Sequence, residues 1–465
     1  MGKATFSTIL SFKSFLMRLT LPVFWGILLV LIGFSPRSTL SQAPGAMPPD
    51  RTIDAQTQKE IIDSVTCALN EIYVFPDVAQ KMEKHLRKKY QKKEYKEITS
   101  LRDFGQKLTE NLQEISKDRH LRVMFMSDEM LAGFQGDTLT DEEKKRELEK
   151  RQRDNFCFKE IKLLEGNIGY IDFRCFSDAG DAGPTAVAAM NFLAHTDAII
   201  FDLRQNGGGS PSMIQLISSY FFDEPVHLNS FYIRKSDSTH QFWTQSHVQG
   251  PRMTDVDIYV LTSSRTFSGA EEFTYNFKNL KRGTIIGETT GGGAHPVDGR
   301  IFSNLNVGMS LPFGRAVNPI TGTNWEGTGV EPDIKVPADE AFEVAHFEAL
   351  KKLYDKCKDE ERKEELDWHI SRLNALRNPV TVDASVLQEY AGVYGPRKIT
   401  LENGVLYYQR EDNPKYRAIP MGNDTFIFEK LDYFRIQFIR DSSGLVNEIV
   451  GLYLGGHQDS HKRDR

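Results

Sequence analysis

The sequence has few cysteines and no pattern that groups them around a metal. Cys67, Cys157, Cys175 and Cys357 lie far apart, and none belongs to a C-x-x-C pair. A zinc site is therefore not expected. One or two disulfides are compatible with these positions in an oxidising compartment. Cys67 and Cys175 have apolar neighbours in the sequence, which is equally typical of buried free thiols.

An excess of positive charge is also missing. The chain of 465 residues has 58 Lys and Arg against 64 Asp and Glu, a formal net charge of −6. The basic stretch 84–96 is interleaved with glutamate, which is typical of a solvated helix face. No nucleic-acid partner is therefore expected.

The N-terminal apolar run, 19–34, is shorter than the roughly 20 residues of a bilayer-spanning helix and contains Pro22. Basic residues precede it and small or polar residues follow it. This order predicts an export signal peptide over 1–42. The alternative is an uncleaved segment that anchors the protein to a membrane. Both interpretations place the protein outside the cytoplasm, as a periplasmic, extracellular or membrane-anchored protein.

Two catalytic signatures are absent. The glycine loop 206–209 is not followed by Gly-Lys-Ser/Thr, which excludes a phosphate-binding P-loop. The sequence around Ser268 is T-F-S-G-A and not G-x-S-x-G, so it does not support the nucleophile turn of an α/β-hydrolase.

The pattern of hydrophobic and polar residues changes several times after the signal segment. Helical periodicity comes first, then apolar strands alternating with amphipathic helices, then charged helices, then short alternating strands with an Asn-Gly turn. The tail 458–465 is expected to be disordered. The predicted units are an N-terminal helical domain (50–155), a core domain (156–340), a helical connector (341–378) and a small β domain (385–456).

The core domain is predicted to be of the α/β class with a mostly parallel sheet. In such sheets ligands gather at the carboxyl ends of the strands, where the loops 204–210 and 263–268 are expected. The expected strands are 167–173, 198–203, 257–262 and 284–287, and the expected helices are 184–195, 211–222 and 271–280.

Ser268 can be interpreted in two ways. It precedes a predicted helix, and Ser-Gly-Ala-Glu matches the S-x-x-E capping box, in which the serine hydroxyl binds a backbone amide. It also follows a strand and stands at the positive end of a helix, where a nucleophile would be exposed. Taken alone, the residue chemistry favours the cap.

The other groups of an acyl-transfer site also have candidates. The amide of Gly269, with that of Gly208 or Gly209, could hold an oxyanion, although a glycine triplet is also typical of a flexible turn. His120 or His295 could serve as the base, because imidazole titrates near neutral pH. Glu326 could orient the base, or be a solvated loop residue.

The combination of motifs is more specific than any one of them. FDLRQNGGGS, SSRTFSGAEEF, KRGTIIGETTGGGAHP and NWEGTGVEPDI, in this order, resemble the C-terminal processing (tail-specific) serine peptidases. Within that superfamily they resemble the interphotoreceptor retinoid-binding-protein-like and tricorn-core branch. The segments 72–82 and 117–123 resemble the N-terminal part of the same branch, so the likeness extends from Ile61 to Val336.

The resemblance implies a crotonase/Clp-like ββα superhelical core and a role for each site residue. Ser268, three residues before Glu271, matches the nucleophile, and His120 and Glu326 match the base and its supporting carboxylate. The lysine base of tail-specific enzymes has no counterpart, because Gly293 stands at its position. The serine that precedes the histidine in the tricorn pattern is Arg119 here, a departure that concerns the orientation of the base and not its identity.

The resemblance therefore implies an exported serine-type peptidase that hydrolyses peptide bonds in peptides or proteins, with no cofactor and no metal. His295 is kept as the alternative base. The second hypothesis is a non-catalytic carrier of apolar ligands such as retinoids or fatty acids, which would need a closed apolar cavity. A third is an esterase with the same residues.

Overall fold

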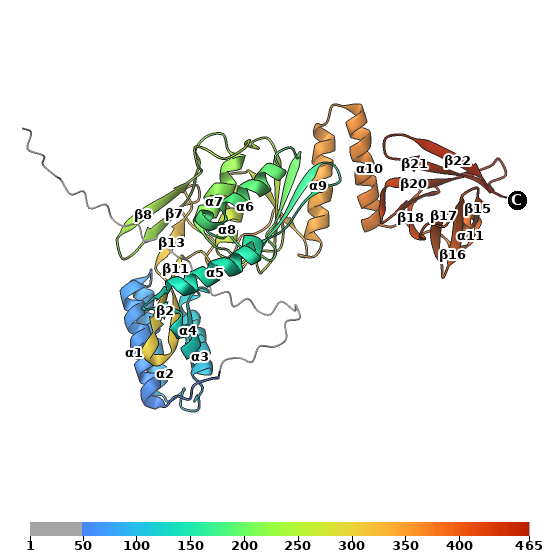
Figure 1. The fold of residues 1–465 in the computed structure, drawn as a ribbon. Coiled ribbons are helices and arrows are strands. Elements are labelled where there is room, and N and C mark those ends of the chain that lie inside the picture. Colours follow the sequence, from blue (N-terminus) through green and yellow to red (C-terminus); the bar gives the residue numbers. More distant parts are fainter. Residues whose placement is uncertain (1–48, 465) are drawn as a thin grey trace, which may run out of the picture.

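The computed structural model describes residues 49–464, which form an N-terminal helical region, a central α/β region and a C-terminal β-rich region (Figure 1). The N-terminal helices and the C-terminal strands lie at opposite ends of the molecule, with the central region between them. The predicted signal peptide, or anchor, falls outside the described residues. Among residues 49–464, no helix combines the length and the apolar character that a bilayer crossing requires.

A six-stranded sheet forms the centre of the protein, in the order β14-β10-β9-β6-β5-β4. Only the β4–β5 pair is antiparallel, so the expected mostly parallel sheet is confirmed. The strands are β4 (Phe158–Leu164), β5 (Ile168–Phe173), β6 (Ala198–Asp202), β9 (Asp257–Thr262), β10 (Gly283–Gly287) and β14 (Ile334–Lys335).

Helices cover both faces of this sheet, which explains why its strands are continuous apolar runs. Apolar residues of three helices form one core with the first face, and those of two further helices form a second core with the other face. The first group is α6 (Ala179–Phe192), α7 (Pro211–Ser218) and α8 (Gly269–Asn279), and the second is α9 (Ala341–Lys356) and α10 (Glu360–Arg377).

The N-terminal region is built from helices that pack against a small antiparallel sheet of order β1-β12-β11. Strand β1 comes from the N-terminal segment, whereas the β11–β12 hairpin comes from the chain after β10, so the two regions share one core. The elements are α1 (Ala55–Ile72), α2 (Pro76–Gln91), α3 (Leu101–Ser116), β1 (Arg122–Phe125), α4 (Asp128–Ala132), β2 (Phe134–Gln135), β3 (Thr138–Leu139), α5 (Asp141–Arg153), β11 (Val297–Phe302) and β12 (Val307–Pro312).

A third sheet lies beside the core, in the order β13-β7-β8. Its strands are β7 (His227–Ile233), β8 (Ser238–Trp243) and β13 (Gly314–Val317), and β7 packs against α8.

The C-terminal region is an antiparallel meander of eight strands in sequence order. Asn403 and Gly404 both have positive φ in the predicted hairpin turn. The expectation of a disordered tail is wrong, because residues 458–462 pair with β21 and the amide of Asp464 reaches the carbonyl of Val393 at 2.8 Å. The elements are α11 (Ala384–Tyr390), β15 (Gly392–Tyr394), β16 (Arg397–Glu402), β17 (Val405–Arg410), β18 (Tyr416–Gly422), β19 (Thr425–Phe428), β20 (Leu431–Arg440), β21 (Val446–Tyr453) and β22 (Gln458–Lys462).

One disulfide joins Cys157, just before β4, to Cys175, just after β5. Cys67 and Cys357 are free. The apolar neighbours of Cys67 suggested a buried thiol, but its side chain is exposed. Helix geometry explains the difference, since Val65 and Leu69 point into the core from α1 and the residue midway between them falls on the opposite side.

Candidate active site

Loops that follow β6, β9 and β10 meet at the carboxyl edge of the central sheet. Gly208 and Gly209 have φ of 104° and 140°, which only glycine adopts without strain. A Cβ on Gly208 would lie 2.7 Å from both the amide nitrogen of Gly269 and the Cβ of Ser268. The glycines therefore allow the loop after β6 to lie directly against the turn that carries Ser268.

Ser268 stands at the N-terminus of α8 with φ 54° and ψ −122°, a region that side chains rarely occupy. Other serine caps in the protein are relaxed, because Ser100, Ser127 and Ser210 have φ between −83° and −67° and accept a hydrogen bond from a nearby amide. A capping role alone therefore does not require the unusual backbone conformation of Ser268. Such strain is typical of functional sites.

Glu271 holds this turn in place. Its carboxylate accepts hydrogen bonds from the amides of Ser268 at 2.9 Å, Gly292 at 2.6 Å and Gly293 at 2.8 Å, and from the hydroxyl of Thr290 at 2.5 Å. The predicted capping box is therefore present, since the Ser268 side chain also faces the backbone amide of Glu271. Burial raises the pKa of Glu271 to about 7, against the opposing effect of these hydrogen bonds.

The glycine amides differ in their availability. The amide of Gly208 donates to the side-chain oxygen of Asn206 at 2.8 Å, so this expected oxyanion donor is already engaged. No hydrogen bond from the amides of Gly209 or Gly269 is found within residues 49–464. Gly269 is the first residue of α8, where amides have no partner inside the helix. A Cβ on Gly269 would lie 2.9 Å from the amide nitrogen of Gly209, so the two free donors are neighbours.

His120 lies next to the serine turn although it belongs to the N-terminal region. Its ring packs on that of Phe267, the residue before Ser268, with centroids 4.6 Å apart. The side chain is buried, and neither ring nitrogen has a hydrogen-bond partner among the described residues. Burial lowers the pKa of His120 to about 4, so the imidazole is neutral over the physiological range.

His295 occupies the other side of the same cluster. Its Nδ1 lies 2.6 Å from a carboxylate oxygen of Asp118 and 3.6 Å from one of Glu326. Burial lowers the pKa of His295, but the hydrogen bond and charge of Asp118 outweigh it, so the pKa is raised. Burial raises the pKa of Asp118, but His295 outweighs it and holds that pKa low.

Glu326 reaches the cluster from the loop after β13. One carboxylate oxygen accepts from the amide of Ala294 at 2.6 Å, whereas the other is buried without a partner. Burial, followed by the charge of Asp118, raises the pKa of Glu326 to about 7. Ligand atoms of Asp118, His120 and Glu326 lie within 4.8 Å of one another, so these three are the described side chains that could hold a metal ion.

Gly293 is the residue at which the resemblance to tail-specific enzymes led us to expect a lysine. A Cβ there would overlap the ring of Phe267 and lie 2.7 Å from Cε1 of His120. These two rings occupy the space that a lysine side chain would need. Arg119, which replaces the expected serine, donates to the carbonyl of Gly291 at 2.6 Å.

A small pocket opens beside Ser268, with a volume of about 30 Å³. Its lining includes Ser268, both free glycine amide residues and His295, so a substrate in it would meet nucleophile, amides and imidazole together. The lining residues are Gly209, Pro211, Phe231, Ser268, Gly269, Glu272, Gly293, Ala294, His295, Pro296, Val297 and Trp325.

Comparison with protein families identifies the two regions that build this site. Residues 167–336 match the model of peptidase family S41, and residues 55–155 match the N-terminal domain of this peptidase family in eukaryotic IRBP. Together the two matches cover more than half of the chain. The chain belongs to peptidase family S41. Membership of this family supports the conclusion that the protein is a hydrolase that acts on peptides or proteins.

Several solved structures of proteases and of a putative peptidase are similar to this chain. The photosystem II D1 C-terminal processing protease is 14% identical, with a TM-score of 0.38 over 61% of this chain and 94% of that one. A putative peptidase from Parabacteroides merdae is 18% identical, with a TM-score of 0.43 over 64% and 97%. The tricorn protease is 14% identical, with a TM-score of 0.39 over 69% and 37%.

No role for Asp118 or Glu272 was expected from the sequence, although both residues belong to motifs that support the resemblance. Asp118 is two residues before His120, and this Asp-x-His spacing was a signal that a carboxylate accompanies the imidazole. Glu272 follows the capping-box glutamate, and sequence alone does not show that it faces the pocket.

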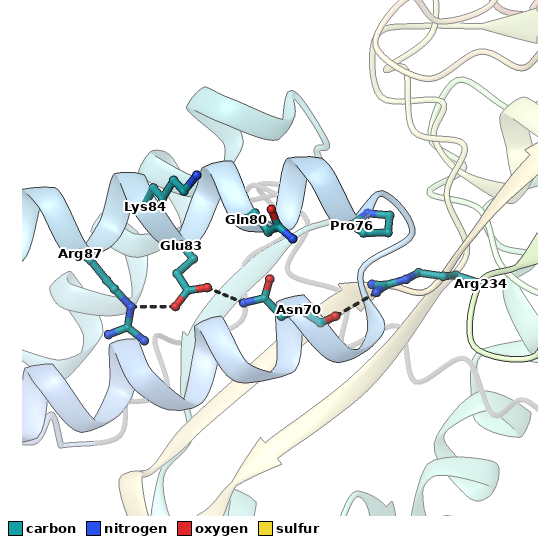
Figure 2. A pocket seen from close by; sticks show the side chains of 7 residues that line it. All are labelled: Asn70, Pro76, Gln80, Glu83, Lys84, Arg87 and Arg234. Carbon is teal, nitrogen blue, oxygen red and sulfur yellow. Dashed lines mark hydrogen bonds and ion pairs between the residues drawn. The ribbon is translucent and has the colours of Figure 1, made fainter.

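A second hollow of this S41 protein lies at the junction of the N-terminal helices and the core (Figure 2). Its polar groups bind each other, since Glu83 accepts from Asn70 at 2.6 Å and from Arg87 at 2.8 Å. Arg234, from the end of β7, donates to the carbonyls of Asn70 at 3.0 Å and Tyr73 at 2.6 Å. These contacts join two regions of the protein and do not indicate chemistry.

Proposed function

We propose that the protein is a serine-type peptidase with Ser268 as nucleophile. The observation that carries this proposal is the strained backbone of Ser268, because the other serine caps of the chain show that capping does not need it. The turn directs the hydroxyl-bearing residue to a pocket edge beside two unbonded amides. This is the arrangement that acyl transfer requires.

In the proposed reaction the Ser268 oxygen bonds to the peptide carbonyl carbon while His120 takes the hydroxyl proton. The negative charge that develops on the carbonyl oxygen is held by the amides of Gly209 and Gly269. The C–N bond then breaks, and the departing amine takes the proton from His120. Water hydrolyses the resulting ester by the same steps in reverse order. Removing one amide donor typically costs roughly 2.7–4 kcal/mol of transition-state stabilisation.

Three observations favour His120 as the base. Its ring is in contact with Phe267, next to the nucleophile. Both ring nitrogens are free of other hydrogen bonds among the described residues, and the low pKa keeps the ring neutral. Glu326 presents an unbonded carboxylate oxygen in the same cluster, where it could stabilise the imidazolium. His295 remains the rival, since it lines the serine pocket and is oriented by Asp118.

The pocket lining supports the peptidase over the apolar-ligand carrier. A carrier needs a closed apolar cavity large enough for its ligand, whereas this pocket measures about 30 Å³ and has a serine, a histidine and a glutamate among its lining residues. We also propose that the protein works outside the cytoplasm. The Cys157–Cys175 disulfide supports this, because such bonds persist in oxidising compartments.

Labelling with a neutral fluorophosphonate probe tests the nucleophile. Wild-type protein is expected to be labelled at Ser268, and Ser268→Ala is expected to lose the label. Ser210→Ala is the matched control, since Ser210 is a relaxed helix cap close to the same glycine loop. Equal labelling of wild type and Ser268→Ala would remove Ser268 as the nucleophile.

A further inference from the structure

The pocket beside Ser268 is narrow enough to limit what can enter it. Its volume of about 30 Å³ is close to the space that one water molecule takes in the liquid. Ser268, Gly209 and Gly269 all line it, so the nucleophile and the two free amides meet at this pocket. A peptide carbonyl held by these groups belongs to the residue whose side chain is nearest to the pocket. The volume therefore limits the size of that side chain.

One wall of the pocket is the indole ring of Trp325, which is held firmly. The residue is 2% exposed, its Nε1 donates to the carbonyl of Gly293 at 2.8 Å, and its ring lies against that of Tyr275 with centroids 5.3 Å apart. The amide of Gly293 in turn donates to Glu271, which also fixes the serine turn. Moving the indole would break a buried hydrogen bond, which costs free energy.

A second wall is the ring of Phe231, which projects from β7. This strand is the middle one of its sheet, because β13 pairs with one side of it and β8 with the other. The ring also packs against that of Phe242 on β8, with centroids 4.9 Å apart. A side chain too large for the pocket would have to displace these packed groups, and overpacking of this kind is costly.

The polar part of the lining does not supply a charge for a longer substrate side chain. Glu272 is 3% exposed, and burial raises its pKa to about 8, although a hydrogen bond with Asn229 opposes the rise. The carboxyl group is therefore mostly protonated at neutral pH. A lysine or arginine side chain would find neither an ionic partner nor room for its stem.

We propose that this pocket selects substrates by size, so that the residue supplying the attacked carbonyl is alanine, serine or glycine. Phe231 and Trp325 are the specificity-determining residues, because their rings form the walls that a larger side chain would meet. The single methyl group of alanine fits a space of this volume, whereas the side chains of leucine and phenylalanine exceed it. This inference rests on the proposed peptidase function and names its substrate class.

The test uses peptidyl aminocoumarin substrates that differ only in their last residue, which is alanine, 2-aminobutyrate, leucine or phenylalanine. The kcat/KM for alanine is expected to exceed that for leucine by at least about 100-fold, because each methylene that a pocket cannot accommodate costs roughly 10-fold or more. The value for 2-aminobutyrate, which has one methylene more than alanine, is expected to lie between them. A kcat/KM for leucine or phenylalanine equal to or above that for alanine would overturn the proposal.

Two variants widen the pocket from different walls. Phe231→Ala and Trp325→Phe are each expected to lower the alanine-to-leucine ratio by at least about 10-fold. Phe125→Ala is the matched control, since Phe125 is a half-buried phenylalanine on β1 that does not line the pocket, and it should keep the wild-type ratio. Fluorophosphonate labelling of Ser268 shows that each variant retains its site. A wild-type ratio in a labelled Phe231→Ala protein would contradict the role of that ring.

A binding measurement separates this inference from the peptidase proposal. Fluorescent peptides that end in alanine or leucine are titrated into Ser268→Ala and into Ser268→Ala with Phe231→Ala. Binding of the alanine peptide at least about 10-fold tighter, with the difference lost in the double variant, supports the small pocket even if hydrolysis is never seen. Equal binding of the two peptides, or no binding of the alanine peptide, would overturn the small pocket. Ser268-dependent hydrolysis that favours leucine would also overturn it and leave the peptidase proposal intact.

Discussion

Asp118 and His295 lie 177 residues apart in the sequence, and their carboxylate oxygen and Nδ1 lie 2.6 Å apart in the structure. Asp118 follows the N-terminal helix α3, whereas His295 follows the core strand β10. Both side chains are buried. Their contact therefore joins the N-terminal region to the core at the place where the candidate active site forms.

This buried pair is predicted to stabilise the protein substantially. Asp118→Ala leaves a buried imidazole without its partner, and is expected to lower the free energy of unfolding by about 3 kcal/mol. Urea unfolding measures the change. The control is Glu71→Ala, which removes the exposed Lys235–Glu71 contact between the same two regions and is expected to cost less than about 1 kcal/mol. Equal effects of the two variants would contradict this role.

The two histidines predict different pH profiles, because a general base must be unprotonated. With His120 as the base, kcat/KM should persist as the pH falls and decline only near pH 4. With His295 as the base, whose pKa is raised, the decline should already occur above pH 6.5. His120→Gln is expected to lower kcat by about 100-fold or more, and His295→Gln by less. Because the pKa of Glu326 is also about 7, an acid limb above pH 6.5 assigns the role to His295 only if it persists in Glu326→Gln.

His120 also predicts a change of stability with pH. Its pKa is about 4 in the folded protein and near 6.5 when unfolded, so the unfolded chain binds more protons between these values. Stability should therefore rise with pH through this window and be lost as the pH falls. At pH 5 the cost of keeping His120 neutral is about 2 kcal/mol relative to pH 8.

Comparison of wild type with His120→Gln isolates this contribution. The loss of unfolding free energy from pH 8 to pH 5 should be smaller in the variant by about 2 kcal/mol. The difference between the two proteins is needed because other groups titrate too. His295 works in the opposite direction, since its raised pKa gives stability below 6.5 that is lost as the pH rises. Parallel curves for both proteins would show that His120 is not buried in the neutral form.

The backbone of Ser268 predicts that glycine is better tolerated there than at a relaxed cap. Ser268→Gly removes the backbone strain that a positive φ causes in a residue with a side chain. Ser100→Gly removes no such strain, because Ser100 has a φ of −83°. The unfolding free energy of Ser268→Gly is expected to exceed that of Ser100→Gly by about 1–2 kcal/mol. Thermal or urea unfolding measures both. Fluorophosphonate labelling should disappear only in Ser268→Gly.

The Cys157–Cys175 disulfide predicts a further stability difference. It closes a loop with a sequence separation of 18, so replacing both cysteines by serine should cost about 3 kcal/mol. Cys67→Ser, at the exposed free cysteine, should change stability by less than about 0.5 kcal/mol. Cys175 is next to Phe176, which pairs with Gly209, so the double variant should also be labelled more slowly by the probe.

Much of the fold could be predicted from local patterns. The strands 257–262 and 284–287 begin and end within one residue of β9 and β10, because continuous apolar runs between loop residues define buried parallel strands. The tail 458–462 was missed, since a polar edge strand has no pattern of its own and forms only when β21 offers backbone partners. The exposure of Cys67 was also missed, because sequence neighbours in a helix do not share a face.

For the candidate site, the residue types and the loops that carry them could be read directly from the sequence. The Ser-x-x-Glu turn, the glycine loop and the two histidines are all visible as local motifs. Which of these residues come into contact depends on how the chain folds. In the fold, the amide of Gly208 donates to the side chain of Asn206, Asp118 contacts His295, and Glu272 lines the pocket. Hydrogen bonds and burial depend on distances between segments that are far apart in the chain, and a local motif contains no information about those distances.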